Sequence, residues 1–262
     1  MQKSRITALT ITALATLALT ACGSEDSAKS ATGAELIKKD TLTVCSDVPY
    51  PPFEDFDKSS DTGFKGFDVD VISSVAEQLD LKLKIQDSSF DALQSGQALN
   101  AGQCDLVASA MTITDDRKKN LDFSDGYYAS KQSLLVPADS KIASIGDLDG
   151  VKVGVQQGTT GKTYTEENAK GADIVTFPSD AEMYQAIKAG QVQALLQDLP
   201  VNLNHVADGG FKIVETYDTD EEYGFAIKKG NSQLVKDVNG ALEKMHSDGS
   251  YDTIYNKYFE VK

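Results

Sequence analysis

The sequence predicts an α/β protein whose two lobes face each other across a cleft. Short runs rich in Val, Leu and Ile alternate with helix-like segments, an order that favours parallel sheets. This alternation occurs twice, before and after the pair Val136-Pro137. The chain shows no obvious catalytic constellation, so its function is to be sought at the carboxyl ends of the strands, where open α/β sheets bind ligands.

The N-terminus has the layout of a signal peptide. Lys3 and Arg5 precede a stretch without charge from residue 6 to residue 20. At about fifteen residues, this stretch is too short to cross a hydrocarbon core of about 30 Å. The small residue directly before Cys22 resembles the bacterial lipobox, which implies removal of residues 1–21 and lipidation of Cys22. An ordinary cleaved signal is the alternative.

Residues 22–40 are predicted to form a flexible tether between that anchor and the body. From Gly23 to Asp40 the chain is rich in Ser, Ala, Gly, Lys and acids, and it has no apolar periodicity. Such a composition is typical of a linker. We expect no folded element there.

The exported part of the chain is strongly acidic. Removing residues 1–21 takes away two basic side chains and no acid, which changes the net charge from −15 to about −17. This argues against nucleic acid or anionic lipid as a partner. The remaining body of roughly 220 residues is large enough for one big domain or two of about a hundred residues. We favour two lobes.

The first α/β unit begins with predicted strands at residues 41–45, 81–85 and 105–109. Between the first two, apolar residues recur at helical spacing after Gly66. These are Phe67, Val71, Ile72, Val75 and Leu79. The resulting order of strand, helix and strand predicts parallel pairing.

The second unit repeats this plan. Strands are predicted at residues 151–155 and 173–177, with a polar helix from about Thr159 between them. Asp180 resembles the cap of a further helix that Gly190 ends. Predicted strands follow at residues 192–197, 211–214 and 223–227. The last two helices are separated by Gly249, and their apolar stripes are interpreted as packing faces.

Cys45 and Cys104 remain as an even pair once Cys22 is assigned to the lipid. In an oxidising compartment they form either a disulfide, which we favour, or two buried thiols. The histidines, His205 and His246, lie in helical contexts and lack metal-ligand spacing. No metal and no cofactor are predicted.

Three polar groups stand at predicted strand ends. Arg117 follows the strand at 105–109 and could hold a carboxylate with two hydrogen bonds, or it could be an exposed arginine paired with Asp115 or Asp116. The turn at residues 156–161 offers N–H groups and hydroxyls to an anion, although such turns are most often simple caps. Asp198 ends another strand, where it could hold an ammonium group or cap the next helix. Together they suit a ligand that carries both charges.

Residues 47–54 form a proline-stiffened loop after the first strand. Tyr50 or Phe53 of this loop could pack on a ligand side chain. With Phe90 they could form an apolar sandwich around an aliphatic stem, with an added contribution if the stem ends in a guanidinium. Taken singly, each aromatic is more often a core residue.

Eight motifs in one order resemble the family 3 extracellular solute-binding proteins, the polar amino-acid binders of ABC importers. They are DVPYPPFE, GFDVDV, FDAL, CDLVASAMTITDDR, LDFSDGYY, VGVQQGTT, the Gln-Asp pair and DGSYDTIYNKYF. The resemblance covers residues 41–259. It implies a two-lobed periplasmic-binding-protein-like fold of type II, with the ligand in the cleft.

The resemblance also implies a role for individual residues. Arg117 binds the ligand α-carboxylate with Thr112 and Thr160, while Asp198 binds the α-ammonium with Ser109. Tyr50 and Phe90 sandwich the side chain of the ligand, and Asp47 and Gln156 bind the far end of that side chain. Ala110 contacts the ligand through its backbone. The family commonly has a small hydroxyl residue or glycine at the position of Ala110.

The same resemblance implies the domain boundaries. Residues 41–129 and 224–262 make the first lobe, and residues 130–223 make the second. The chain crosses between lobes near residues 129–133 and 223–225, and hinge closure buries the ligand. An ABC permease in the membrane then recognises the closed form.

The sequence therefore predicts a lipid-anchored binding protein on the outer face of the cell membrane, a monomer by default. An enzyme such as a dehydratase on the same scaffold would need an acid or base aimed at a reacting atom. A lipoprotein that presents its ligand to a sensor is a third reading. Arginine or another basic amino acid is favoured as ligand because of Asp47, with glutamine next. Glutamate is disfavoured.

Overall fold

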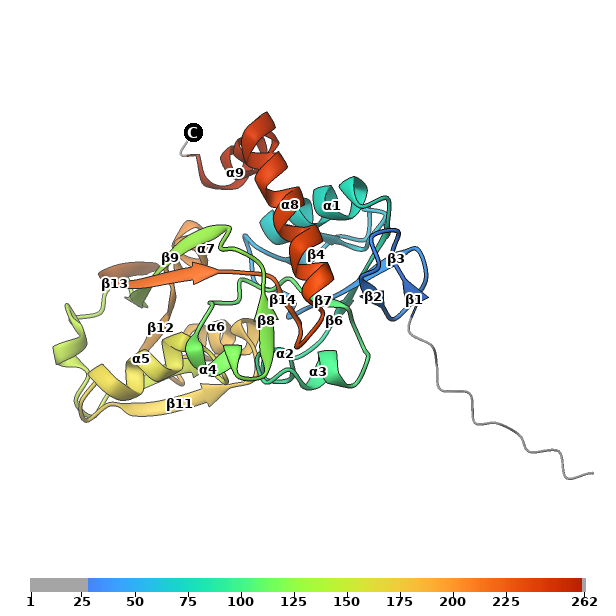
Figure 1. The fold of residues 1–262 in the computed structure, drawn as a ribbon. Coiled ribbons are helices and arrows are strands. Elements are labelled where there is room, and N and C mark those ends of the chain that lie inside the picture. Colours follow the sequence, from blue (N-terminus) through green and yellow to red (C-terminus); the bar gives the residue numbers. More distant parts are fainter. Residues whose placement is uncertain (1–27, 261–262) are drawn as a thin grey trace, which may run out of the picture.

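The computed structural model describes residues 28–260, which form two lobes with a five-stranded sheet in each (Figure 1). The predicted signal peptide at residues 1–21 and the predicted lipid site at Cys22 lie outside the described residues. Within residues 28–260, no helix is both long and apolar enough to cross a membrane.

The first lobe is built on the sheet with strand order β6-β3-β7-β14-β8. β3 (Thr41–Ser46) runs parallel to β6 (Lys82–Asp87) and β7 (Leu106–Val107), which confirms the predicted parallel pairing. β14 (Ala226–Lys228) comes from the far end of the chain and pairs antiparallel with β7 and β8 (Leu121–Phe123).

Three long helices of the first lobe pack together beside this sheet (Figure 1): α1 (Phe67–Gln78), α8 (Ser232–Asp248) and α9 (Ser250–Phe259). Gly66 starts α1 at a φ of 135°, and a side-chain carbon there would lie 2.0 Å from the carbonyl oxygen of Phe53. Only glycine fits this close approach. The remaining elements are α2 (Phe90–Gln94), α3 (Gln97–Asn100), α4 (Asp115–Lys118) and the hairpin of β4 (Asp55–Phe56) and β5 (Phe64–Lys65).

The second lobe is built on the sheet with strand order β11-β10-β12-β9-β13. β10 (Lys152–Gln156) lies between β11 (Asp173–Phe177) and β12 (Ala194–Asp198) and runs parallel to both. β9 (Tyr128–Pro137) and β13 (Phe211–Tyr223) complete the sheet in antiparallel fashion. The helices of this lobe are α5 (Thr160–Asn168), α6 (Asp180–Lys188), α7 (Leu199–Ala207) and the short 3₁₀ helix η1 (Ile145–Asp147).

The cap of α6 differs from the prediction. Ser179, not Asp180, is the N-cap, and its hydroxyl accepts the backbone N–H of Glu182. Asp180 is the first helical residue, and its buried carboxylate accepts a hydrogen bond from Gln197 and contacts His205. The aspartate is thus held by partners distant in sequence, which local pattern cannot reveal.

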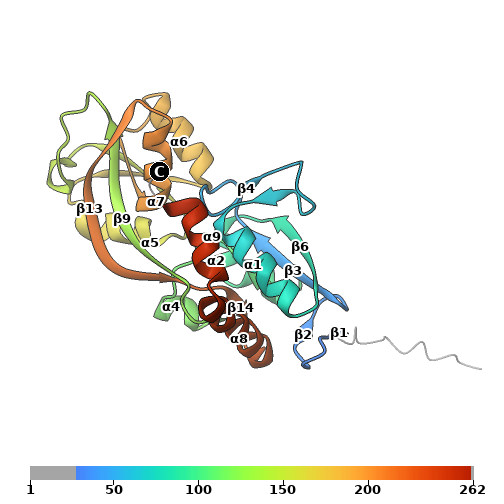
Figure 2. The ribbon, with the colours of Figure 1, turned by 90° about the horizontal axis from the view of Figure 1, so that it is seen from above.

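The chain passes between the lobes twice, along two adjacent segments. The first passage joins β8 to β9 and the second joins β13 to β14, and the backbone N–H of Tyr127 donates to the carbonyl of Tyr223 between them. Both views show β9 and β13 running side by side into this region (Figures 1 and 2). Since β9 already begins at Tyr128, the first passage lies a few residues earlier than the predicted crossing at 129–133.

Residues 28–40 are folded, contrary to the expectation of a tether without structure. β1 (Ala28–Lys29) and β2 (Glu35–Leu36) form a small hairpin. Leu36 is buried, and Glu35 exchanges backbone hydrogen bonds with the side chain of Asn231. These contacts join segments about 200 residues apart, so composition alone could not indicate them.

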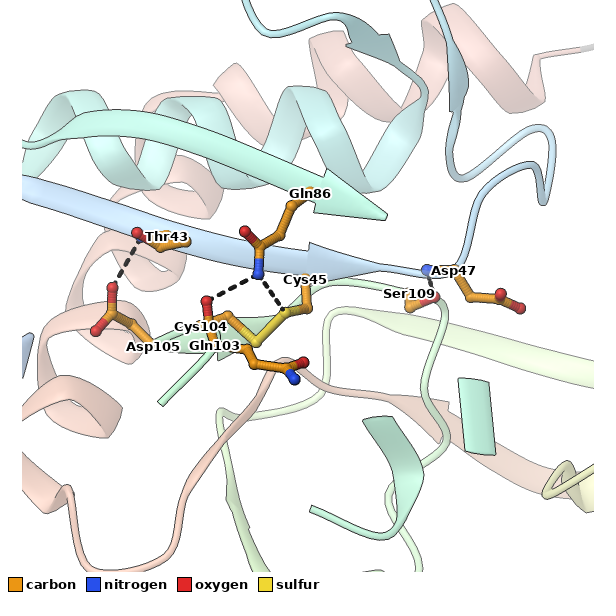
Figure 3. The surroundings of a disulfide bond; sticks show 8 residues. All are labelled: Thr43, Cys45, Asp47, Gln86, Gln103, Cys104, Asp105 and Ser109. Carbon is orange, nitrogen blue, oxygen red and sulfur yellow. Dashed lines mark hydrogen bonds between the residues drawn. A yellow bond between two sulfur atoms is a disulfide. The ribbon is translucent and has the colours of Figure 1, made fainter. Parts of the chain in front are cut away.

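Cys45 and Cys104 form a disulfide that joins β3 to the segment before β7. Figure 3 shows Gln86 beside it, donating to the carbonyl of Gln103 and to the sulfur of Cys45. Asp47 follows two residues after the bridge, and its backbone N–H donates to the hydroxyl of Ser109 (Figure 3). The disulfide therefore fixes the strand ends from which these side chains leave.

Candidate ligand-binding pocket

The strand ends of both lobes meet around one small pocket. Ten of the side chains singled out from the sequence line it, and Thr159 is added to them. The lining residues are Asp47, Tyr50, Phe90, Ser109, Ala110, Thr112, Arg117, Gln156, Thr159, Thr160 and Asp198. They converge because parallel strands present their carboxyl ends at one edge of a sheet.

Arg117 is buried at one end of this pocket, with 6% of its surface exposed. Its Nη1 donates to the carbonyl of Thr112 at 2.7 Å, and its Nη2 donates to the carbonyl of Gly158 in the other lobe at 3.0 Å. Burial lowers the pKa of Arg117 to about 10. The alternative of an exposed arginine paired with Asp115 or Asp116 is therefore wrong.

Asp198 faces the same end from the second lobe. Its carboxylate accepts hydrogen bonds from the hydroxyl of Tyr50 at 2.8 Å and from the amide of Gln132 at 2.5 Å. It stands at the N-cap position of α7, but its side chain makes no capping hydrogen bond. Burial raises the pKa of Asp198 to about 6, with a further contribution from Glu221. A positive charge in the pocket would stabilise its ionised form.

Asp47 and Gln156 meet at the other end of the pocket. The amide of Gln156 donates to Asp47 at 2.6 Å and to the carbonyl of Pro178 at 3.2 Å. Burial raises the pKa of Asp47 to about 7, although the hydrogen bond from Gln156 opposes that shift. This end thus pairs one acid of the first lobe with one amide of the second.

Tyr50 and Phe90 form the aromatic walls. The guanidinium carbon of Arg117 lies 5.2 Å from the centre of the Phe90 ring, a cation–π contact that orients the arginine. Phe53 does not line the pocket. It is fully buried and packs edge-on against Phe67, Tyr128 and Tyr223. Its candidate role on the ligand is corrected to that of a core residue.

Two buried acids, Glu54 and Asp68, contact the first-lobe residues Ser109 and Ala110 that line the pocket. Ser109 donates its hydroxyl to Glu54 at 2.7 Å, and Asp68 accepts the backbone N–H of Ala110 at 2.8 Å. Burial and the charge of Asp68 raise the pKa of Glu54 well above its usual range. Ala110 has a φ of 43°, a left-handed conformation that is strained for alanine. The backbone of residues 109–110 is thereby fixed against the pocket.

No group of three or more His, Cys, Asp or Glu that could hold a metal ion occurs in residues 28–260. The buried His205 belongs to the second lobe, where it contacts Asp180 and stacks on Tyr184. Neither histidine lines the pocket.

Comparison with known proteins gives the family. The profile of the bacterial extracellular solute-binding proteins, family 3, matches residues 42–261. This chain belongs to that family. The sequence resemblance is thereby confirmed, and so is the two-lobed fold that it implied.

Two relatives of this solute-binding protein align over nearly its whole length. A probable histidine-binding protein of Neisseria gonorrhoeae is 37% identical, with 94% of this chain and 92% of that protein covered. The ABC transporter glutamine-binding protein GlnH of Bacillus subtilis (strain 168) is 36% identical, with 95% of each covered. Among solved structures, an ancestral arginine-binding protein bound to arginine is 38% identical with a TM-score of 0.79, covering 85% of this chain and 99% of that one.

Sequence reasoning missed three acids of the solute-binding protein near the pocket: Glu54, Asp68 and Glu221. Glu54 stood inside the quoted motif DVPYPPFE and Asp68 inside GFDVDV, whereas Glu221 stood in none of the quoted motifs. Glu221 lies on β13, and its contacts come from residues about 60 to 110 positions earlier in the chain. Thr159 was within the quoted turn at residues 156–161, where its position after a strand was the available signal.

Proposed function

We propose that this solute-binding protein captures a free polar amino acid between its lobes and delivers it to the permease of an ABC importer. One observation carries the proposal. Arg117 of the first lobe and Asp198 of the second, opposite in charge and both buried, line the same end of one small pocket. A zwitterionic α-carbon group supplies the complementary charges on neighbouring atoms.

The α-carboxylate is assigned to Arg117 and to two backbone N–H groups. Thr160 is the first residue of α5, so its N–H has no acceptor within the helix. The backbone N–H of Thr112 donates no hydrogen bond within residues 28–260. The α-ammonium is assigned to Asp198 and Ser109, with the backbone of Ala110 beside them.

The side chain of the ligand is assigned to the aromatic walls and to the Asp47–Gln156 end. Tyr50 and Phe90 suit an aliphatic stem, and Asp47 suits a cationic head. The lining residues include two acids and one base, so a neutral zwitterion leaves an excess negative charge in the pocket. We therefore rank arginine and other basic amino acids first and glutamine second. The names of the relatives, which include histidine, glutamine and arginine binders, agree with this class.

Delivery is proposed to depend on closure of the lobes about the two passages at residues 124–127 and 224–225. We propose the lobes to be residues 41–129 with 224–262 and residues 130–223, a division that the two separate sheets support. We further propose export by the signal at residues 1–21 and anchoring through lipid on Cys22, with a monomer as the working unit. Catalysis is not proposed, because none of the lining residues is a histidine and each lining acid is assigned to ligand binding.

A thermal-shift screen of residues 24–262 against the standard amino acids tests the proposal. A ligand that binds only the folded protein raises its stability by about 2.7 kcal/mol at a hundredfold excess over Kd. We expect a shift with arginine, lysine, histidine or glutamine. If protein freed of co-purified ligand shifts with no amino acid, the proposed function is rejected and non-amino-acid solutes come next.

A further inference from the structure

Glu221 joins the two lobes at the rim of the pocket. Its Oε2 accepts the hydroxyl of Thr112 in the first lobe at 2.7 Å and the hydroxyl of Thr160 in the second at 2.8 Å. The other oxygen, Oε1, accepts the amide of Gln132 at 3.0 Å and the hydroxyl of Thr219 at 2.9 Å. One buried carboxylate is therefore held by four donors, of which Thr112 is on the opposite lobe from the other three.

The backbone of β13 is shaped to aim this side chain inward. The pairing of β13 with β9 shifts register between Tyr217 and Glu221, and Asp220 adopts a left-handed φ of 50°. A bulge of this kind re-aims the side chain that follows it. Glu222, the next residue, is exposed, whereas Glu221 is 8% exposed.

Glu221 lies outside the ligand pocket. It lines the open cleft on the other side of Thr112, Arg117 and Thr160, and it is not among the residues that line the pocket itself. Gln132 lies between Glu221 and Asp198 and donates to both carboxylates. The residues proposed to hold the α-carboxylate thus stand between the ligand space on one side and Glu221 on the other.

We propose that Glu221 is a positioning residue for ligand binding, a carboxylate latch that ties Thr112 to Thr160 across the closed cleft; this proposal rests on the proposed function. Because a carboxylate only accepts, both hydroxyl protons point at Glu221 and away from the ligand. The ligand carboxylate is then held by Arg117 and the two backbone N–H groups.

The latch acts on release more than on capture. Thr112 and Thr160 can share one carboxylate oxygen only while the lobes are together, so the contact forms after the ligand has entered. Opening the cleft breaks the hydrogen bond from Thr112 to Glu221, and a bond to a charged acceptor is stronger than a neutral one, while the bond from Thr160 stays within the second lobe. Removing Glu221 therefore speeds dissociation and leaves the association rate nearly unchanged.

Dissociation of radiolabelled arginine from the protein of residues 24–262, chased with unlabelled arginine, tests the latch. We expect Glu221→Ala to release arginine at least about tenfold faster than wild type, which corresponds to about 1.4 kcal/mol. Glu221→Gln keeps one acceptor oxygen and is expected to be intermediate. Glu222→Ala, an equal charge change on the adjacent exposed residue, is the matched control and should behave as wild type.

A release rate of Glu221→Ala equal to that of Glu222→Ala overturns the latch. So does an equal fall in the association rate, because that result indicates a general structural defect. A wild-type protein that binds no amino acid instead rejects the proposed function. In that case small-angle scattering tests the latch without a ligand. A larger radius of gyration for Glu221→Ala than for wild type and Glu222→Ala supports the latch, and equal radii overturn it.

Discussion

The two ends of the pocket are built differently. At the Arg117–Asp198 end, each charged group is fixed by its own protein partners, two carbonyls for the arginine and two donors for the aspartate. At the Asp47–Gln156 end, the acid and the amide hold each other across the cleft. We therefore propose that the first end keeps its geometry for any amino acid, while the second rearranges for each ligand side chain. Under this proposal, common anchoring and selectivity are separated in space.

The largest effect is expected at the fixed end. Arg117→Ala removes the buried charged group proposed to hold the α-carboxylate. The binding free energy should weaken by about 2–5 kcal/mol, and by a similar amount for every amino acid. Calorimetric titration with arginine and with glutamine measures the loss. Lys119→Ala is the control and should bind normally, because Lys119 is an exposed cation at the end of α4, the helix that carries Arg117. A loss confined to one ligand would contradict the separation of the two ends.

A smaller and ligand-dependent effect is expected from Asp47. Its pKa of about 7 means that the carboxyl is substantially protonated just below neutral pH. A bound cation favours the ionised form, so binding releases a proton and affinity for arginine falls as pH drops below about 7, at most about tenfold per pH unit. Glutamine carries no side-chain charge and lacks this dependence.

Comparing the pH dependence of arginine and glutamine binding separates the effect of Asp47 from that of Asp198. Asp198, with a pKa of about 6, is proposed to bind the ammonium group common to both ligands, so its titration should affect both equally. In Asp47→Asn the difference in pH profile between arginine binding and glutamine binding should disappear. The protein should also lose its preference for arginine. Parallel pH profiles for both ligands in the wild type would assign Asp47 a structural role only.

The smallest effect is expected at Ala110. Its left-handed backbone is strained for an L-residue and not for glycine, so Ala110→Gly should raise the free energy of unfolding by up to about 1 kcal/mol. Urea denaturation measures this change. Amino-acid affinity should stay the same, since the backbone contact survives; weaker binding would show that the methyl group itself shapes the pocket.

Most of the pocket was predictable because its residues follow strands of parallel pairs. Once β3, β6, β10 and β12 were recognised, their carboxyl ends had to meet within each sheet. The two-lobed plan implied by the resemblance then placed the two edges face to face, which brought Asp47, Phe90, Gln156 and Asp198 together. The alternatives for Arg117 were left open by spacing alone. Its burial against Phe90 and Gly158 depends on both lobes, which local sequence does not encode.

The rest was not predictable for related reasons. Glu221 is directed inward by a bulge in an antiparallel strand, and Phe53 is drawn into the core by aromatic residues from distant segments. The hairpin at residues 28–36 depends on Asn231 and the start of α8. In each case the deciding contact joins residues at least about 60 positions apart in the chain, which a local pattern cannot show.

The second lobe is one uninterrupted stretch of chain from β9 to β13, inserted between β8 and β14 of the first. The chain enters and leaves the second lobe through the two neighbouring passages described above. Recombination at two breakpoints, near residues 124–127 and 224–225, would thus exchange Gln156, Thr160 and Asp198 together while keeping Asp47, Phe90 and Arg117. The architecture allows half a recognition surface to be inherited as a cassette.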